Sequence, residues 1–136
     1  MRLIVCVDDR NGMLFGGRRQ SRDCVVCQQV VEIATNSKLW MNAYSAKLFS
    51  DYSEKILVDD DFLSKAEEND FCFVESNNIL SYLSDISSII LFKWNRHYPA
   101  DKYFPIDLNG GGWKLCNSAN FAGKSHENIT MEEYRR

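Results

Sequence analysis

The stretch Leu3-Ile4-Val5-Cys6-Val7 decides the class of fold. It is a short, continuously apolar and largely β-branched run, which is the pattern of a strand buried on both faces of a parallel sheet. A strand of this kind lies near the centre of its sheet, so later segments must supply further strands and the helices that cover them. The run therefore predicts an α/β protein with a central first strand.

A loop and a helix are expected next. Residues 8–20 contain Asn11-Gly12 and Gly16-Gly17, and glycine permits the positive φ that tight reversals need. Ser21 is expected to cap a helix that carries Asp23 in its first turn, where the helix dipole favours negative charge. This helix should end near residues 35–36. Its buried stripe is expected to consist of Val26, Val30, Ile33 and Ala34.

Strand-like and helix-like runs alternate along the middle of the chain. Strands are expected at residues 38–41, 56–58, 71–74 and 89–94, and helices at residues 44–49, 59–68 and 79–83. Such alternation implies a mostly parallel sheet with helices on both faces. Two further β-like runs, at residues 113–121 and 129–134, flank a turn-prone segment and predict a C-terminal antiparallel hairpin.

The composition is that of an ordinary globular protein. Of the 136 residues, 45% are hydrophobic and 26% are charged, which is too apolar for an intrinsically disordered chain. This length lies in the range of one domain, so residues 1–136 are expected to form a single domain without a metal or disulfide. The formal net charge of −3 argues against a nucleic-acid partner for the molecule as a whole, but leaves a local basic patch open.

Cysteine content and hydropathy predict a cytoplasmic protein. The five cysteines are odd in number and mostly flanked by apolar residues, as expected of buried thiols in a reducing compartment. They are Cys6, Cys24, Cys27, Cys72 and Cys116. Cys24 and Cys27 have the spacing of a redox motif, but they fall inside the expected helix, which favours packing thiols. No run of about 18 apolar residues occurs, so no membrane association is expected.

The two ends of the chain resemble the dihydrofolate reductase family. The opening apolar run, followed by Asp8 and by Asn11-Gly12-Met13, is similar to that family's first strand and the loop that covers its active site. The closing part is similar to its aspartate-x-x-phenylalanine-proline, tryptophan and C-terminal strand signatures, at residues 100–105, 113–115, 123–127 and 134–136. The resemblance implies that family's α/β fold, with a mostly parallel central sheet, helices on both faces and a C-terminal antiparallel hairpin.

The family's reaction transfers a hydride from NADPH to a pterin, with a buried carboxylate assisting protonation of the ring. The resemblance assigns this carboxylate to Asp23, as the catalytic residue if the protein is a reductase. It also places Val5, Met13 and Met41 among the ligand-binding candidates. Without the resemblance, Asp23 is better explained as an acid that complements the helix dipole, and with the resemblance both interpretations stay open.

The segment before Asp23 departs from the family's pattern. The family's leucine-proline-tryptophan is here Arg18-Arg19-Gln20, which argues against folate recognition. With Arg22, the two arginines surround the expected helix N-terminus and are ligand-binding candidates for a phosphate group. A solvated loop with scattered charge is the alternative.

The segments that bind NADPH in the family are changed most. Its Gly-Gly pair after the strand at residues 71–74 is here Glu75-Ser76, and a carboxylate at that point repels phosphate and obstructs close backbone approach. Its glycine-arginine-threonine turn becomes residues 42–45, and the strand end that recognises the 2′-phosphate carries Asp59-Asp60-Asp61. The resemblance therefore implies a degenerate cofactor site and no cofactor. Its residues are Asn42, Tyr44, Ser45, Asp59, Glu75 and Ser76.

The two histidines give no sign of a metal site or a catalytic triad. Four-ligand zinc sites need more histidine or cysteine pairs than His97, His126 and the single Cys-x-x-Cys provide, so no metal is expected. His126 is expected in the C-terminal hairpin. It cannot form a triad with its neighbours Ser125 and Glu127, because adjacent side chains on a strand point to opposite faces.

Three functions remain open on the sequence. The first is a binding or regulatory protein that keeps the reductase fold without its reaction and recognises a protein partner or a small-molecule ligand. The second is a divergent NADPH-dependent reductase of a pterin or related molecule, with Asp23 as proton relay. The third is phosphate or nucleic-acid binding through the loop that carries Arg18, Arg19 and Arg22.

Overall fold

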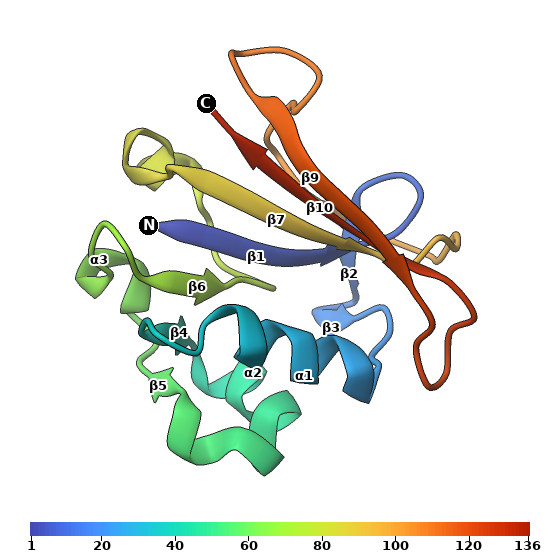
Figure 1. Ribbon diagram of the computed structural model, residues 1–136, viewed down its shortest axis with the longest axis horizontal. Helices are drawn as coiled ribbons and strands as arrows, with labels where there is room; N and C mark the ends of the chain where they lie inside the picture. Colours follow the sequence, from blue (N-terminus) through green and yellow to red (C-terminus); the bar gives the residue numbers. More distant parts are fainter.

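A seven-stranded sheet runs through the computed structural model, which describes residues 1–136. In spatial order its strands are β5 (Leu57–Val58), β4 (Leu39–Met41), β6 (Phe71–Phe73), β1 (Arg2–Val7), β7 (Ser88–Lys93), β10 (Ile129–Arg135) and β9 (Lys114–Phe121). The first strand lies in the middle of the sheet, between β6 and β7 (Figure 1). This position confirms the prediction made from its continuous apolar run.

The sheet is parallel except at its C-terminal edge. β1 pairs in parallel with β6 and β7, and β4 pairs in parallel with β5 and β6. β10 runs antiparallel to both β7 and β9, with a register shift between Glu133 and Tyr134. The predicted fold class, a mostly parallel sheet closed by an antiparallel hairpin, is therefore confirmed.

Each face of the sheet carries its own hydrophobic core. Along β1, Leu3 and Val5 belong to one core and Ile4 to the other, because successive side chains of a strand point to opposite faces. The helix α1 (Cys24–Ile33) packs Val26 and Val30 onto the Ile4 face. The opposite face is covered by the short α3 (Phe62–Lys65) and the 3-10 helix η2 (Leu80–Asp85), together with Ile79 and Ile86 beside them.

The middle of the chain is less helical than predicted. The expected helix at residues 44–49 is split into α2 (Ala43–Ala46) and the 3-10 helix η1 (Lys47–Lys55). The expected helix at residues 59–68 is reduced to α3, whose last residue is followed by Ala66 in extended conformation. Only Phe62 and Leu63 are buried there, so the apolar stripe is too short to hold a longer helix.

The expected loop at residues 8–20 contains strands that sequence reasoning missed. β2 (Gly12–Phe15) pairs with β3 (Arg18–Arg19) and with β8 (Lys102–Tyr103) in a separate three-stranded sheet. The turn between β2 and β3 is made by Gly16 and Gly17, which have φ values of 59° and 75°. This hairpin matters for the site because it fixes the position of Arg19.

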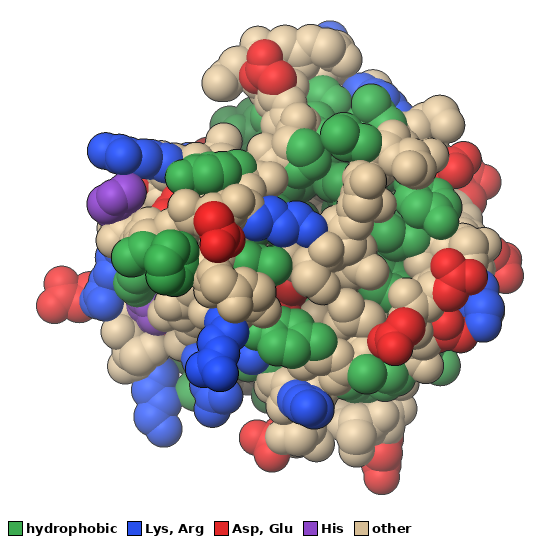
Figure 2. All heavy atoms as spheres, turned by 180° about the vertical axis from the view of Figure 1, so that it is seen from behind, with side chains coloured by type: hydrophobic (Ala, Val, Ile, Leu, Met, Phe, Trp, Pro, Cys, Tyr) green, Lys and Arg blue, Asp and Glu red, His purple; other side chains and the backbone are tan.

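The surface carries charges of both signs. Figure 2 shows Lys and Arg side chains gathered toward the left of one face, with Asp and Glu side chains among them.

Cys24 and Cys116 are exposed, contrary to the expectation of buried thiols, whereas Cys27 and Cys72 are buried. No helix has both the length and the apolar character needed to cross a bilayer.

Candidate functional site

Asp23 is the N-cap of α1. Its backbone is extended (φ −152°, ψ 129°), and its Oδ1 accepts a hydrogen bond of 2.9 Å from the backbone N–H of Val25. The expectation that Ser21 caps this helix is therefore wrong. Asp caps a helix as well as Ser does, and the side chain of Ser21 is engaged elsewhere.

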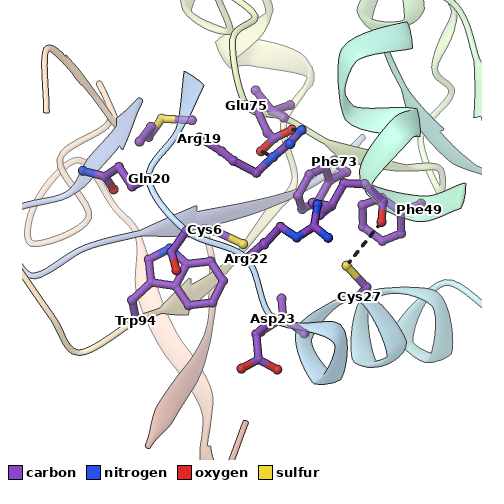
Figure 3. Close-up of a pocket in the computed structure, with 15 residues that line it drawn as sticks. Cys6, Arg19, Gln20, Arg22, Asp23, Cys27, Phe49, Phe73, Glu75 and Trp94 are labelled. Carbon is purple, nitrogen blue, oxygen red and sulfur yellow. Dashed lines mark hydrogen bonds and ion pairs between the residues drawn. The ribbon is translucent and has the colours of Figure 1, made fainter. Parts of the chain in front are cut away.

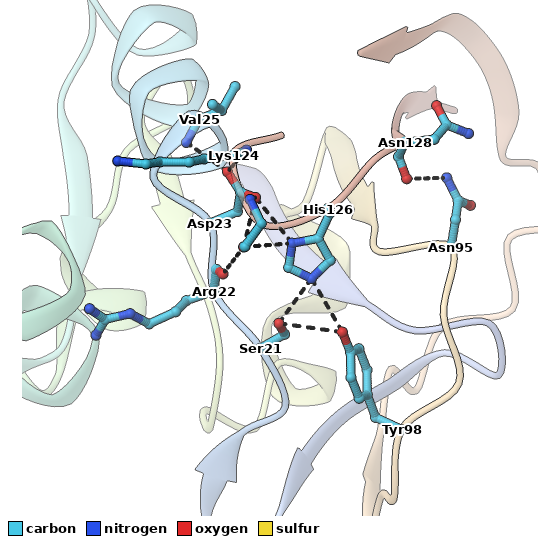
Figure 4. Close-up of polar contacts among 10 residues, drawn as sticks. Ser21, Arg22, Asp23, Val25, Asn95, Tyr98, Lys124, His126 and Asn128 are labelled. Carbon is cyan, nitrogen blue, oxygen red and sulfur yellow. Dashed lines mark hydrogen bonds and ion pairs between the residues drawn. The ribbon is translucent and has the colours of Figure 1, made fainter. Parts of the chain in front are cut away.

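The carboxylate of Asp23 is held by donors from the turn between β9 and β10. Oδ1 also accepts the backbone N–H of Lys124 at 3.0 Å. Oδ2 accepts the backbone N–H of Ser125 at 2.8 Å, its Oγ at 3.0 Å and Nδ1 of His126 at 3.0 Å (Figure 4). With Val25, these contacts make five donors to one carboxylate whose side chain is 0% exposed. We call this arrangement the Asp23 clasp.

The clasp favours the ionised form of Asp23. Burial by itself would raise the pKa of this carboxyl, but the hydrogen bonds from the amides of Lys124 and Ser125 and from His126 outweigh it. They hold the pKa of Asp23 well below its usual range. An ionised carboxylate with every oxygen occupied anchors the start of α1 to the C-terminal hairpin.

His126 is the residue that sequence reasoning placed in the hairpin and set aside. It lies in the turn between β9 and β10, its side chain is 3% exposed, and its ring stacks on Trp94 with centroids 4.6 Å apart. Its Nε2 lies 3.0 Å from Oγ of Ser21 and 3.2 Å from the hydroxyl of Tyr98. No local pattern indicates this role, because Asp23 and His126 are 103 positions apart in the chain.

A second buried carboxylate, Glu75, follows β6 and pairs with Arg19. The guanidinium donates through Nε to Oε2 at 2.8 Å and through Nη2 to Oε1 at 2.9 Å, which is the bidentate geometry typical of strong arginine–carboxylate pairs. Oε1 also accepts Oγ of Ser45 at 2.8 Å. Arg19 lies over the ring of Tyr44, 4.4 Å from its centroid. We call this arrangement the Glu75 pair (Figure 3).

The turn before α2 uses its own side chains to satisfy its backbone donors. Oδ1 of Asn42 accepts the backbone N–H of Ser45, and Oδ1 of Asp60 accepts that of Ala43, both at 2.9 Å. Asp59 accepts the backbone N–H of Asp61 and pairs with Lys65. Donors in the segment that the resemblance links to phosphate binding are therefore already occupied by side chains of the protein itself.

Asp23 and Glu75 line the same cavity, which is very small. Its volume is about 20 Å³, roughly enough for one water molecule. Among the predicted ligand-binding residues, Met13, Arg19 and Arg22 line it. Figure 3 shows the carboxylate of Asp23 pointing away from Arg19 and Glu75. Asn42, Tyr44, Ser45 and Ser76 do not line this cavity, and neither do the buried Val5 and Met41.

An open groove lies next to this cavity, between α1, η1 and the turn at Lys124 and Ser125. Its volume is about 580 Å³, within the range of small-molecule sites. Arg22, Lys47 and Lys124 contribute positive charge, and Asp51 is its exposed acid. The groove was not foreseen, because its residues come from three segments that are distant in sequence.

The three arginines of the predicted phosphate-binding loop have separate positions. Arg19 is bound to Glu75, Arg18 is exposed on β3, and Arg22 lines both the cavity and the groove. They do not converge on one point at the start of α1. No group of three His, Cys, Asp or Glu side chains is arranged to hold a metal ion.

Known proteins similar to this chain are found by comparing structures, not by comparing sequences. No protein-family model and no curated protein matches the sequence. Among solved structures, the dihydrofolate reductase from Enterococcus faecalis complexed with NADP(H) and RAB-propyl is similar, with a TM-score of 0.68. The match covers 99% of this chain and 95% of that chain at 13% sequence identity. The chain therefore has a dihydrofolate reductase-like fold, and at this identity the likeness concerns the fold alone.

Proposed function

We propose that this protein uses the dihydrofolate reductase-like fold as a binding or regulatory protein without the reductase reaction. The observation that carries the proposal is the Asp23 clasp. A carboxylate with five donors and no exposed surface has no acceptor left to hold a pterin. Its low pKa also makes it a poor proton relay, because general acids work best with a pKa near the operating pH.

The Glu75 pair and the turn before α2 support the same proposal. Phosphate groups bind where backbone N–H groups and cations are free to receive them. Here Arg19 and Ser45 donate to Glu75, and the first amides of α2 donate to Asn42 and Asp60. NADPH would have to displace these internal acceptors and then meet the charge of Glu75.

The ligand that best fits the remaining space is a small anion in the groove between α1 and η1. Arg22, Lys47 and Lys124 supply cations there, and the volume of about 580 Å³ suits a small molecule rather than a long one. A macromolecular polyanion fits less well, because Asp51 is exposed among the basic residues of the same groove. Nucleic-acid binding through Arg18 and Arg22 would show an affinity that falls steeply with salt.

The alternative is a divergent NADPH-dependent reductase of a pterin or related small molecule. The observation that favours it is the similarity to an Enterococcus faecalis enzyme that was solved as an NADP(H) complex. In that case Asp23 would be the catalytic acid and the Glu75 pair would open to admit the cofactor. The two proposals therefore differ in one measurable property, which is saturable binding of NADPH.

Calorimetry with NADPH, dihydrofolate and citrate separates these possibilities. We expect no saturable binding of the first two, and binding of citrate, used as a small polyanion, that raises the melting temperature. The variant with both Lys47→Ala and Lys124→Ala should lose the citrate effect. Lys114→Ala, an exposed change on β9 away from the groove, is the matched control. Micromolar NADPH binding would overturn our proposal and support the reductase alternative.

A further inference from the structure

Ser21, His126 and Asp23 form a continuous line of polar contacts. Oγ of Ser21 lies 3.0 Å from Nε2 of His126, and Nδ1 of the same ring lies 3.0 Å from Oδ2 of Asp23 (Figure 4). A hydroxyl, an imidazole and a buried carboxylate at these distances are the parts of an activated nucleophile. The three residues come from the segment before α1 and from the turn between β9 and β10. They are not adjacent residues of one strand, so the alternation of side chains that rules out a triad with Ser125 and Glu127 does not apply to them.

The Asp23 clasp determines which nitrogen of His126 carries the proton. An ionised carboxylate only accepts hydrogen bonds, so Nδ1 must donate to Oδ2. In the neutral ring, Nε2 then carries the lone pair and faces the hydroxyls of Ser21 and Tyr98. Stacking on Trp94 fixes the plane of the ring. The five hydrogen bonds that make Asp23 unsuitable as a proton relay thus allow it to hold the ring of a histidine in a fixed orientation.

The surroundings of Ser21 also offer donors for a developing negative charge. The backbone N–H groups of Arg22, Asp23 and Cys24 donate to no acceptor in the chain. They lie at the start of α1, where the helix dipole favours negative charge. Free N–H groups beside a nucleophile can stabilise the oxyanion of an acyl-transfer intermediate.

We propose that Ser21 is the nucleophile of an acyl-transfer site that hydrolyses esters of small carboxylic acids. His126 is the general base, and Asp23 is a positioning residue that acts through His126. Ser21 lines the small cavity bordered by Cys6, Met13 and Val26, and its volume of about 20 Å³ restricts the site to the smallest acyl groups. Ser21 itself is half-buried, and the two residues that follow it, Arg22 and Asp23, line the adjacent groove.

The reaction balances with water as the only co-reactant. Oγ of Ser21 attacks the ester carbonyl while its proton passes to Nε2 of His126, which forms a tetrahedral oxyanion. The bond from the carbonyl carbon to the alcohol oxygen breaks, and that oxygen takes the proton from Nε2. Water then gives a proton to Nε2 and attacks the acyl carbon. The carboxylic acid leaves as Oγ regains its proton.

Tyr98 provides an internal comparison. Its hydroxyl lies 3.2 Å from the same Nε2 and 3.5 Å from Oγ of Ser21, so it competes with Ser21 for the lone pair. Replacing it with Phe leaves Nε2 to Ser21 alone. If Ser21 is a nucleophile, Tyr98→Phe should be acylated at the same rate as the wild type or faster. If the cluster is purely structural, neither the wild type nor Tyr98→Phe should be acylated.

A fluorophosphonate probe with intact-mass and peptide mass spectrometry is the decisive test, because it phosphonylates activated serines. We expect one adduct on Ser21, no adduct in Ser21→Ala, and unchanged labelling in Ser118→Ala, an exposed serine of β9. Hydrolysis of p-nitrophenyl acetate should fall in parallel. A folded protein that gives no adduct, or an adduct only on another residue, would overturn the proposal.

The positioning role of Asp23 has its own readout. Nitrogen NMR of the imidazole reports whether Nδ1 or Nε2 carries the proton. We expect Nδ1–H in the wild type and Nε2–H in folded Asp23→Asn, because the amide NH2 of Asn can donate to Nδ1 where the carboxylate can only accept. An unchanged tautomer with unchanged labelling would show that Asp23 serves stability alone. These measurements are independent of the calorimetric tests of ligand binding.

Discussion

Asp23 and Glu75 are both buried carboxylates that line one cavity, but the chain neutralises them in different ways. Asp23 is surrounded by three backbone amides, a hydroxyl and an imidazole. Glu75 relies on one cation, Arg19, and on the hydroxyl of Ser45. The first arrangement is fixed by backbone geometry at the two ends of the chain. The second depends on a single side chain from a short hairpin, so it is the region more easily altered.

The largest effect is expected from Asp23→Ala. This change removes the N-cap of α1 and leaves several buried donors without an acceptor, so the free energy of unfolding should fall by about 4 kcal/mol. Urea denaturation at neutral pH measures it. Asp51→Ala, an exposed change in the adjoining groove, should stay within about 0.5 kcal/mol of the wild type. Equal losses in the two variants would contradict the clasp.

Arg19→Ala should be the next most destabilising change. It leaves Glu75, which is 7% exposed, as an unpaired buried charge. We expect a loss of about 2 to 3 kcal/mol, at the lower end for buried pairs because Arg19 is itself 18% exposed. Arg18→Ala, the neighbouring exposed arginine, is the control and should have little effect. A loss as large as that of Asp23→Ala would remove the contrast between the two regions.

The pH dependence of stability sharpens the contrast further. The pKa of Asp23 is lowered by folding, so the unfolded chain takes up the proton first, and this stability is complete above the unfolded pKa of about 4. It should be lost progressively as the pH falls below about 4 toward the folded pKa. Unfolding curves at stepwise lower pH should therefore decline steeply in the wild type and less steeply in Asp23→Asn. Parallel curves would show that the clasp does not stabilise the ionised carboxylate.

The smallest effect is expected when the whole Glu75 pair is replaced. The double variant Arg19→Met with Glu75→Leu removes both charges together, so no uncompensated charge remains. Its stability should lie within about 1 kcal/mol of the wild type, in contrast to Arg19→Ala alone. Thermal unfolding of the two variants makes the comparison. If the double variant is as unstable as the single one, the pair contributes packing that Met and Leu do not replace.

The likeness of fold and the proposed loss of a reductase-like site have a common explanation. A TM-score of 0.68 at 13% identity reflects a retained pattern of apolar strands and helices, because many apolar residues fill such a core equally well. The polar residues of a site cannot be exchanged in this way, because their chemistry and positions determine what they bind. Fold and function therefore need separate arguments, and here the proposed function rests on Asp23, Glu75 and the groove.

The sequence by itself determined the framework. The apolar run at residues 3–7 places β1 at the centre of the sheet, and the alternation of strands and helices specifies the parallel order. Both can be predicted because the residues of each segment show whether it is buried on both faces. The substitution of Glu75-Ser76 for glycines was also visible in the sequence. The length of α3 and the β2–β3 hairpin were not, since short elements depend on the surfaces they pack against.

Only the tertiary structure decided the site. The contact between Asp23 and His126 joins residues 103 positions apart, and the contact between Arg19 and Glu75 joins residues 56 positions apart. Hydrophobic periodicity carries no information about which polar side chains meet across such distances, because the partners are set by strand order and turn geometry together. For that reason His126 was correctly placed in the hairpin, but its contact with Asp23 was not foreseen, and Ser21, interpreted as a helix cap, contacts His126 instead.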